Sequence, residues 1–420
     1  DFHETRLLDQ HKISSSYSRF SKEAKKKVEL DQCALLGKHG EKMLLLLNDD
    51  SMLRIAKDAD MLECALTARE YFDIGYKKTT VFRELLKLAD LKEDIIRTAI
   101  KYAKDNLHFD FSLVFYDVTT LYFETFKDDD LRKHGFSKDN KINQPQILIG
   151  LVVNDCGFPI YYDIFKGNTF EGKTIIPAIL AIKDKYRIDK FTVVADAGML
   201  SEANLIGLEA NGIDYVVGAR IGNLNLSQAQ GIASELNQTD GKIIKRDNLL
   251  YEYMANRARK DKADNDKQIE KAEYYLHNPS KALKRSKFLE NTNKKTFRVN
   301  QTLIEKHRLL EGIKGYKTNI NHLSPELLID RYKDLWKIEQ SFRMAKSDLE
   351  ARPIYHRKRS SIKYHILIVF VALCMARVIE MEKGESIKKA MDDLKDKWTI
   401  TLVDDISGNS LKILIDKKPH

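Results

Sequence analysis

The spacing of apolar residues along the chain changes near residue 110. Before that point, segments such as 81–90 and 93–106 repeat apolar side chains every three or four residues, with few glycines and no proline. This is the period of amphipathic helices, so we predict a helical N-terminal region over residues 1–108. After it, short β-rich runs alternate with helical segments, which predicts an α/β domain.

The segment from 109 to 221 predicts a mixed sheet. An apolar, aromatic run reaches Asp117 and continues beyond it, and two further β-rich runs flank the turn Asn154-Asp-Cys-Gly157, as in a hairpin. Asp196 ends a fourth run, and Ser201 is placed to cap the helix after it. The predicted elements are strands at 112–124, 146–153 and 159–165, a helix at 173–186, a strand at 191–195, a helix at 201–211 and a strand at 214–219. The order βββαβαβ predicts a ribonuclease H-like mixed sheet flanked by helices.

Residues 222–312 are predicted to form an inserted subdomain, because about ninety residues are too many for a loop within a compact domain. The core resumes with a strand at 315–320. Ser324 and Pro325 then open a helix that is predicted to run to about Ala351. We therefore divide the chain into a helical region 1–108, the first part of the core 109–221, the insertion 222–312, the rest of the core 313–380 and a tail region 381–420.

The chain is basic, with 71 Lys and Arg against 62 Asp and Glu. A net charge of +9 suits a polyanionic partner, although it would also serve solubility alone. The excess is concentrated, since residues 240–298 hold 16 basic and 9 acidic side chains. A second basic cluster follows the last predicted helix and contains Arg352, His356, Arg357, Lys358, Arg359 and Lys363.

The spacing of the cysteines and the hydropathy of the chain bear on its redox compartment and on membrane association. The four cysteines lie far apart without a CxxC pair, which argues against a structural zinc site or a disulfide framework and favours a reducing compartment. The one strongly apolar run, 366–376, has eleven residues, whereas a membrane span needs roughly twenty. We predict a buried helix there and no membrane partner.

Two aspartates stand at or near the carboxyl ends of predicted strands. A rigid strand would hold Asp117 and Asp196 in place to bind a hard divalent cation, because Mg²⁺ prefers oxygen ligands in strict geometry. Two such ions ~4 Å apart promote phosphoryl displacement. Each aspartate taken singly would serve equally well to begin a turn, as Asp196-Ala-Gly198 shows.

The last predicted helix carries a third acid. In a continuous helix, Tyr332, Glu339 and Lys346 would share one face, because they are seven residues apart, and Arg343 would lie one turn beyond Glu339. Such a face is either an ordinary charge ladder or a metal-binding glutamate beside cations that hold phosphates. We predict that Trp336 packs in the core; exposed, it would instead stack on a distorted DNA base.

This helix resembles the Y-x2-R-x3-E-x6-K signature of a large class of bacterial insertion-sequence transposases with a DDE active site. Tyr332, Glu339 and Lys346 match it in residue and spacing, and Leu335 takes the arginine position, as in a subgroup that reads Y-x-x-L-W-x-I-E-x-x-F-R-x-x-K. The sequences around Asp117 and Asp196 look like the first two acid motifs of that subgroup. The resemblance covers about 110–380 and is weak over residues 1–108.

The resemblance implies a ribonuclease H-like core that uses two Mg²⁺ or Mn²⁺ ions to nick the ends of an element and to transfer the 3′-OH into target DNA. Asp117, Asp196 and Glu339 would be the metal ligands, and Tyr332 and Lys346 would contact DNA near the scissile phosphate. We add DNA contacts by Arg343, from helix geometry, and by the basic cluster Arg352, His356, Arg357, Lys358 and Arg359.

The same resemblance implies double-stranded DNA, as element ends and as target, for a partner. It also implies a homodimer that joins two ends and a cytoplasmic, nucleoid-associated bacterial location. The 1–108 region would then serve DNA binding or dimerisation. Because the chain begins at Asp1 with neither a Met nor a signal-peptide pattern, we expect that region to be truncated.

Two other functions fit the same fold. One is a structure-specific ribonuclease H-like nuclease, which needs no strand transfer and no large insertion. The other is a domesticated protein that binds DNA without activity, which the presence of all three acids disfavours. Nicking and joining of an element end, lost on replacement of each acid, would separate a transposase from both.

Overall fold

The computed structural model describes residues 90–416, apart from 138–140, 142, 187, 189, 200, 279–285, 294–295, 396 and 404–409. Most of the predicted helical region 1–108 therefore lies outside the described residues. Its last part is helix α7 (Lys92–Leu107), whose first turn contains Glu93 and Asp94 and which ends at His108 in a left-handed conformation. Acidic residues in a first turn stabilise a helix through its dipole.

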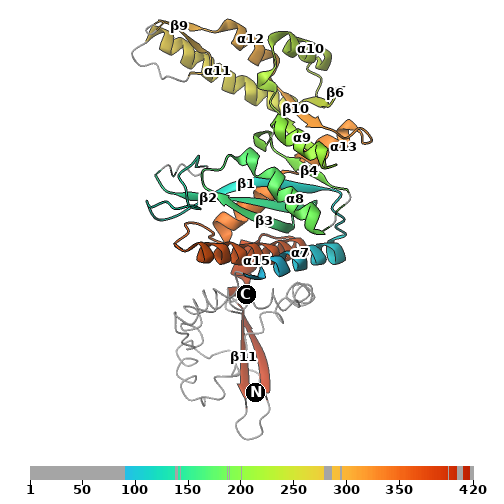
Figure 1. Cartoon of the computed structure of the whole chain (residues 1–420), viewed down its shortest axis with the longest axis vertical. Helices are drawn as coiled ribbons and strands as arrows, with labels where there is room; N and C mark the ends of the chain where they lie inside the picture. The colour runs from blue at the N-terminus through green and yellow to red at the C-terminus, as the bar shows by residue number, and fades with distance from the viewer. Residues whose placement is uncertain are drawn as a thin grey trace.

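An eight-stranded mixed sheet, with strand order β3-β2-β1-β4-β5-β10-β7-β6, forms the centre of the molecule (Figure 1). Strands β1, β2 and β3 are antiparallel neighbours, and β4 and β5 run parallel to β1. The strands are β1 (Val114–Tyr122), β2 (Gln146–Asn154), β3 (Pro159–Lys166), β4 (Thr192–Ala195), β5 (Asp214–Ala219), β6 (Ile243–Arg246), β7 (Leu249–Tyr253) and β10 (Ile313–Thr318). The first five have the predicted βββαβαβ order, so the ribonuclease H-like fold is confirmed.

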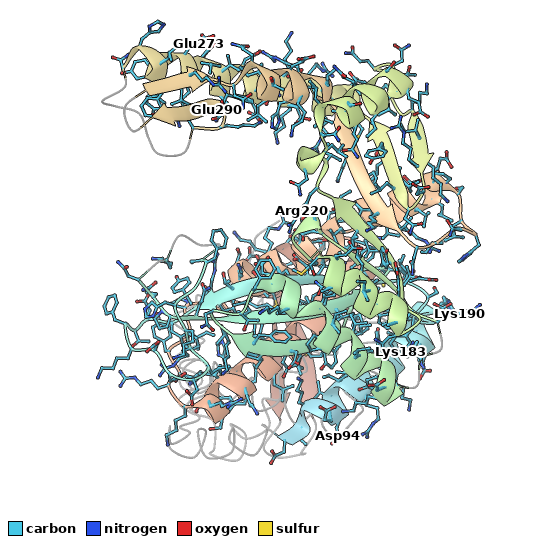
Figure 2. The ribbon with its side chains drawn as sticks, turned by 45° about the horizontal axis from the view of Figure 1, so that its top comes forward. Asp94, Lys183, Lys190, Arg220, Glu273 and Glu290 are labelled. Carbon is cyan, nitrogen blue, oxygen red and sulfur yellow. The ribbon has the colours of Figure 1, made fainter. Side chains whose placement is uncertain are left out.

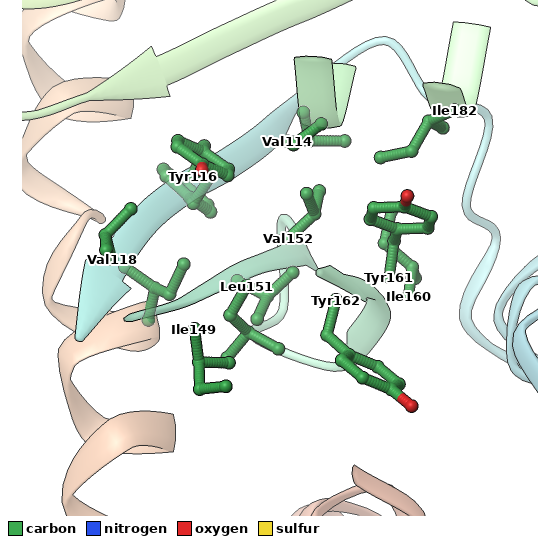
Figure 3. Packing of buried hydrophobic residues seen from close by; sticks show 14 of the residues in the cluster. Val114, Tyr116, Val118, Ile149, Leu151, Val152, Ile160, Tyr161, Tyr162 and Ile182 are labelled. Atoms are coloured by element: carbon green, nitrogen blue, oxygen red, sulfur yellow. The ribbon is translucent and has the colours of Figure 1, made fainter. Parts of the chain in front are cut away.

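Helices cover both faces of this sheet, which explains why all nine residues of β2 are buried. Helices α8 (Ile175–Tyr186) and α9 (Glu202–Ala210) connect the parallel strands, and the Ser201 side chain caps α9 as predicted. On one face Tyr161 meets Ile182 of α8; on the other lie Ile149, Leu151 and Tyr162 (Figure 3). The Tyr162 ring packs on Phe370 of α15, 4.9 Å between centroids.

The insertion begins by extending the sheet. Its hairpin β6–β7 pairs with β10, and its remaining elements build a lobe beyond that edge, with a small core of its own (Figure 1). Glu273 and Glu290 lie at the far end of this lobe (Figure 2). The other elements of the lobe are α10 (Leu226–Leu236), α11 (Ala255–His277), β8 (Leu289–Asn293), β9 (Thr296–Val299) and α12 (Gln301–Leu309).

The predicted helix from Ser324 to Ala351 is wrong as a single element. It consists of α13 (Pro325–Lys333), α14 (Trp336–Arg343) and a π-helical segment, Met344–Asp348. Between α13 and α14 the amides of residues 335, 337 and 338 bond to the carbonyl three positions earlier, which tightens the turn there. Residues on either side of the break therefore do not share a simple seven-residue face. The predicted start is confirmed, because the Ser324 side chain accepts from Leu327 N.

Helix α15 (Arg359–Lys383) contains the apolar run predicted as a buried helix. Its length and composition alone would allow it to cross a membrane, but 61% of its most apolar window is buried inside the protein. It packs on β3 and α7, as a core helix does. Helix α16 (Ile387–Lys395) and the hairpin of β11 (Lys397–Val403) and β12 (Ser410–Asp416) follow it.

Candidate active site

Asp117 and Asp196 lie at the same level on neighbouring parallel strands. Val114 and Phe115 of β1 are in register with Val193 and Val194 of β4. Two residues further along, the same register sets Asp117 beside Asp196, and strands in a sheet are about 4.8 Å apart. Both carboxylates therefore project from one face of the sheet.

The position of Asp117 differs in detail from the prediction. It is the fourth of nine residues in β1 rather than at the end of the strand, whereas Asp196 directly follows β4. The reason is the long pairing with β2, which continues to Tyr122 opposite Gln146. Asp117 is thus held within the sheet by its pairing with Leu151 of β2.

Backbone amides orient the two carboxylates. The Oδ1 atom of Asp196 accepts hydrogen bonds from Gly198 N at 2.6 Å and from Met199 N at 3.2 Å. The Oδ1 atom of Asp117 accepts from Val118 N at 2.7 Å. Both side chains are half-buried. Bonds of this kind fix the direction of a carboxylate.

Tyr332 is the residue on which the charges of the two aspartates and of Glu339 all act. It lies at the end of α13 with 7% of its surface exposed, and its hydroxyl lies against Gly218 of β5, which is also next to Ala197, the residue after Asp196. Burial raises the pKa of Tyr332 to about 12, and the negative charges of Asp196, Glu339 and Asp117 add to the rise in that order. All three acids therefore act electrostatically on one phenol.

Glu339 projects from α14, which packs on β1 and β2. It is exposed, unlike the half-buried aspartates. Three carboxylates supply the oxygen ligands that Mg²⁺ and Mn²⁺ prefer, so the donor set fits a hard divalent ion. Within the described residues, however, no three acidic, histidine or cysteine side chains are gathered closely enough to enclose a metal. Asp117, Asp196 and Glu339 are the residues that would hold the metal.

Arg343 and Lys346, two further predicted DNA contacts, follow Glu339 along the chain. Arg343 is exposed and lines an open cleft of about 600 Å³ between α14 and helices α15 and α16. Lys346 is half-buried within the π-helical segment. Lys346 also lines a small pocket with Thr119 of β1, which is two residues from Asp117.

The basic cluster lies near the far end of β1. Ile354 pairs with Phe123 there, six residues beyond Asp117, or roughly 20 Å along an extended strand. Arg357, Lys358 and Arg359 are exposed at the start of α15, and the half-buried Arg352 lies 6.0 Å from the Tyr122 ring. These four cations are therefore positioned to contact DNA only at a distance from the acids.

His356 differs from the rest of the cluster. It is half-buried, with its ring 5.4 Å from that of Tyr364 and 5.3 Å from that of His365. Burial lowers its pKa, which disfavours the positive charge that would attract a phosphate.

Trp336 corrects another prediction. Its side chain is 53% exposed, one helical turn before Glu339, so it does not pack in the core as predicted. Its neighbour Leu335 is 7% exposed, which agrees with a packing rather than a phosphate-binding residue in the arginine position of the signature. The structure also reveals residues at the site that sequence reasoning missed, Gly218, Arg257 and Lys314. They lie on β5, α11 and β10, and no local spacing connects them with the acids.

A mixed sheet of this order is the architecture of ribonuclease H-like enzymes. Comparison with known proteins identifies the family to which the chain belongs. A family model described as a transposase DDE domain matches residues 108–375, most of the chain. The chain therefore belongs to the transposase DDE domain family, whose members use divalent metal ions.

Two solved structures are similar over part of the chain. One is a piggyBac transposase synaptic complex with hairpin DNA, at 11% identity and a TM-score of 0.39, covering 75% of this chain and 56% of that one. The other is a Mos1 transposase paired-end complex with the left transposon end, at 14% identity and a TM-score of 0.19, covering 42% of this chain and 57% of that one. The chain thus spans little more than half the length of either protein. No curated protein matches the sequence.

Proposed function

We propose that the protein is a DNA transposase that nicks DNA at the ends of a mobile element and joins the freed 3′-OH to target DNA. The observation that carries this proposal is the register of β1 and β4, which sets Asp117 beside Asp196, with Glu339 on the helix α14 that packs on β1. It occurs within the region that matches the transposase DDE domain. The three carboxylates would bind two Mg²⁺ or Mn²⁺ ions.

Divalent ions at such a site supply activation of the attacking oxygen and stabilisation of the leaving oxygen. The protein's own residues supply the positioning. Asp117 and Asp196, side by side on neighbouring strands, supply two ligands from a rigid sheet, and Glu339 projects from α14. The Tyr332 phenol keeps its proton at neutral pH, because its pKa is about 12, and it is therefore a hydrogen-bond donor for a phosphate oxygen near the acids.

The proposed substrate is double-stranded DNA, both as element ends and as target. The exposed cations Arg357, Lys358 and Arg359 would contact phosphates of the DNA that leads away from the acids. The sequence of α13 and α14 supports assignment to the subgroup with leucine in the arginine position. We further propose that two copies act together, since two ends must be joined, and that they act in the bacterial cytoplasm at the nucleoid.

Incubation with Mn²⁺ and supercoiled plasmid tests the first step of this activity. Replacing Asp117, Asp196 or Glu339 by alanine should abolish nicking, and EDTA should abolish it in the wild-type protein. Asp155→Ala is a matched control, because Asp155 is an exposed acid in the β2–β3 turn. Nicking that survives Glu339→Ala would refute the assignment of the third ligand.

Joining is tested with the DNA that flanks the gene. Short inverted repeats found there define a duplex that ends in the natural 3′-OH. Incubation of this duplex with plasmid and Mn²⁺ should give covalently joined products with the wild-type protein and none with the three alanine variants. Nicking without any joining would favour a nuclease over a transposase.

A further inference from the structure

Lys314 is a half-buried cation beside the acidic site. It lies on β10, where its register partner on β7 is Glu252. Its ammonium group is 4.6 Å from the centroid of the Tyr332 ring and 5.5 Å from that of Tyr316. Lys314 and Tyr316 are two residues apart on the strand, so both project toward α13. The lysine therefore lies on the same side of the sheet as the phenol that the three acids surround.

The acid nearest to Lys314 in the sheet is already paired. Glu252 is 4% exposed, and its Oε2 atom accepts a hydrogen bond of 2.8 Å from the Tyr316 hydroxyl. Its Oε1 atom accepts from Lys333 Nζ, also at 2.8 Å. Both oxygens of Glu252 thus have partners other than Lys314. No ion pair joins Lys314 to any carboxylate in the described part of the chain.

Other cations surround the same position. Burial lowers the pKa of Lys314, and the positive charges of Arg257 and Lys333 lower it further, against the opposing effect of Glu252 and Glu339. Arg257 belongs to the first turn of α11, which packs on the start of β10, since a Cβ at Gly312 would lie 2.7 Å from the Ala258 Cβ. The insertion therefore brings Arg257, which forms an ion pair with Asp261 of α11 at 3.3 Å, to the edge of the catalytic core.

A partly buried charge without a counter-ion is costly, and rings alone compensate little of the cost. A bound anion would remove it. In the proposed function, the anion available beside Tyr332 is a phosphate of the bound DNA. Phosphate oxygens accept strong hydrogen bonds from lysine.

We infer that Lys314, supported by Arg257, binds a phosphate of the DNA strand next to the scissile bond and so couples the insertion to the catalytic core. This inference rests on the proposed function, since it takes DNA as the ligand. It makes Lys314 a substrate-binding residue of β10 outside the signature on α13 and α14. The insertion then contributes to holding the strand that is cut.

The test compares Lys314→Met with Lys317→Met. Lys317 lies on the same strand but on the opposite face, where it pairs with Glu202 at 3.4 Å. Binding of the full chain to a 30-base-pair duplex of arbitrary sequence is measured in EDTA over a series of NaCl concentrations. Loss of one phosphate contact should make the slope of log K against log salt shallower by about 0.9 for Lys314→Met only.

Nicking of supercoiled plasmid with Mn²⁺ provides the second readout. Lys314→Met should lose about 10- to 100-fold in rate, the effect of one hydrogen bond to a charged group. Lys314→Arg, which keeps the charge, should retain the salt slope, and Lys317→Met should match the wild type in both assays. A folded Lys314→Met protein with the wild-type salt slope would overturn the inference.

A measurement on the wild-type protein covers the case in which Lys314→Met does not fold. Lysines are acylated with and without the duplex in EDTA, and the labelled sites are read by mass spectrometry. Protection of Lys314 by DNA supports the inference, and equal labelling overturns it. A wild-type protein that protects Lys314 but neither nicks nor joins DNA would contradict the proposed function and leave the phosphate contact standing.

Discussion

The hydroxyl of Tyr332 is packed against Gly218, so closely that a Cβ at that glycine would lie 2.6 Å from Tyr332 Oη and 3.1 Å from Ala197 N. Gly218 pairs with Tyr316 across β5 and β10, and the Tyr316 ring meets the Tyr332 ring edge-on at 4.9 Å. The absence of a side chain on β5 thus allows the phenol to reach the acids.

Gly218→Ala should therefore displace Tyr332. We expect a loss of about 1–3 kcal/mol in the free energy of unfolding, the usual cost of overpacking, together with a fall in plasmid nicking. Gly222→Ala is the matched control, because a Cβ there meets nothing within 4 Å. Urea unfolding and nicking rates measure the two effects. Wild-type activity in Gly218→Ala would show that the position of the phenol is unimportant.

Tyr332→Phe removes the hydroxyl and keeps the ring. Nicking should fall by about tenfold or more, as expected for loss of a hydrogen bond to a charged phosphate. The pKa of about 12 means that the folded state retains the phenol proton between pH 10 and 12, whereas the unfolded state loses it. Stability due to this group is present below pH 10 and is lost as pH rises toward 12.

The pH dependence of Tyr332→Phe separates this tyrosine from the others. Between pH 10 and 12 its free energy of unfolding should decline less steeply than that of the wild type, by at most about 1.4 kcal/mol per pH unit for one proton. Denaturant unfolding at pH 9, 10 and 11 measures the slopes. Parallel curves would mean that the phenol ionises as it does in water.

Trp336→Ala should leave stability within about 0.5 kcal/mol of the wild type, because the side chain is 53% exposed. Ile338→Ala, two residues on and fully buried, should cost about 2–5 kcal/mol. The chain has two tryptophans, so Trp398→Phe leaves Trp336 as a single fluorescent reporter. Quenching on addition of duplex DNA is expected if the indole stacks on a base, and unchanged emission would argue against contact.

The burial of His365 predicts that the free energy of unfolding decreases in mild acid. Burial lowers its pKa to about 4, and its Nε2 atom lies 3.1 Å from the Ala351 carbonyl oxygen. The unfolded state takes up a proton near pH 6.5 and the folded state only near pH 4, so stability falls as pH decreases between these values. NMR titration of the ring should give a midpoint below pH 5. A midpoint near 6.5 would contradict the burial of the ring.

The sequence alone determined the first five strands of the sheet, β10 and the order of these strands along the chain. The apolar runs before Asp117 and up to Asp196 have the length and composition of buried strands, and Ser201 and Ser324 cap helices where their side chains predict. These features are local, because burial of a short run and capping of a helix depend on a few adjacent residues. The same is true of the apolar run that became α15.

Only the tertiary structure determined how the residues of the candidate active site are placed relative to one another. The level of Asp117 with Asp196 depends on the register between β1 and β4, whose residues are almost eighty positions apart in the chain. The break before α14 and the exposure of Trp336 follow from packing of that helix on β1. The seven-residue spacing in the sequence does not predict this packing. Lys314 and Arg257 reach the site because the hairpin β6–β7 extends the sheet past β10. Periodicity records which face of an element is buried, whereas contacts between distant strands depend on how the whole chain packs.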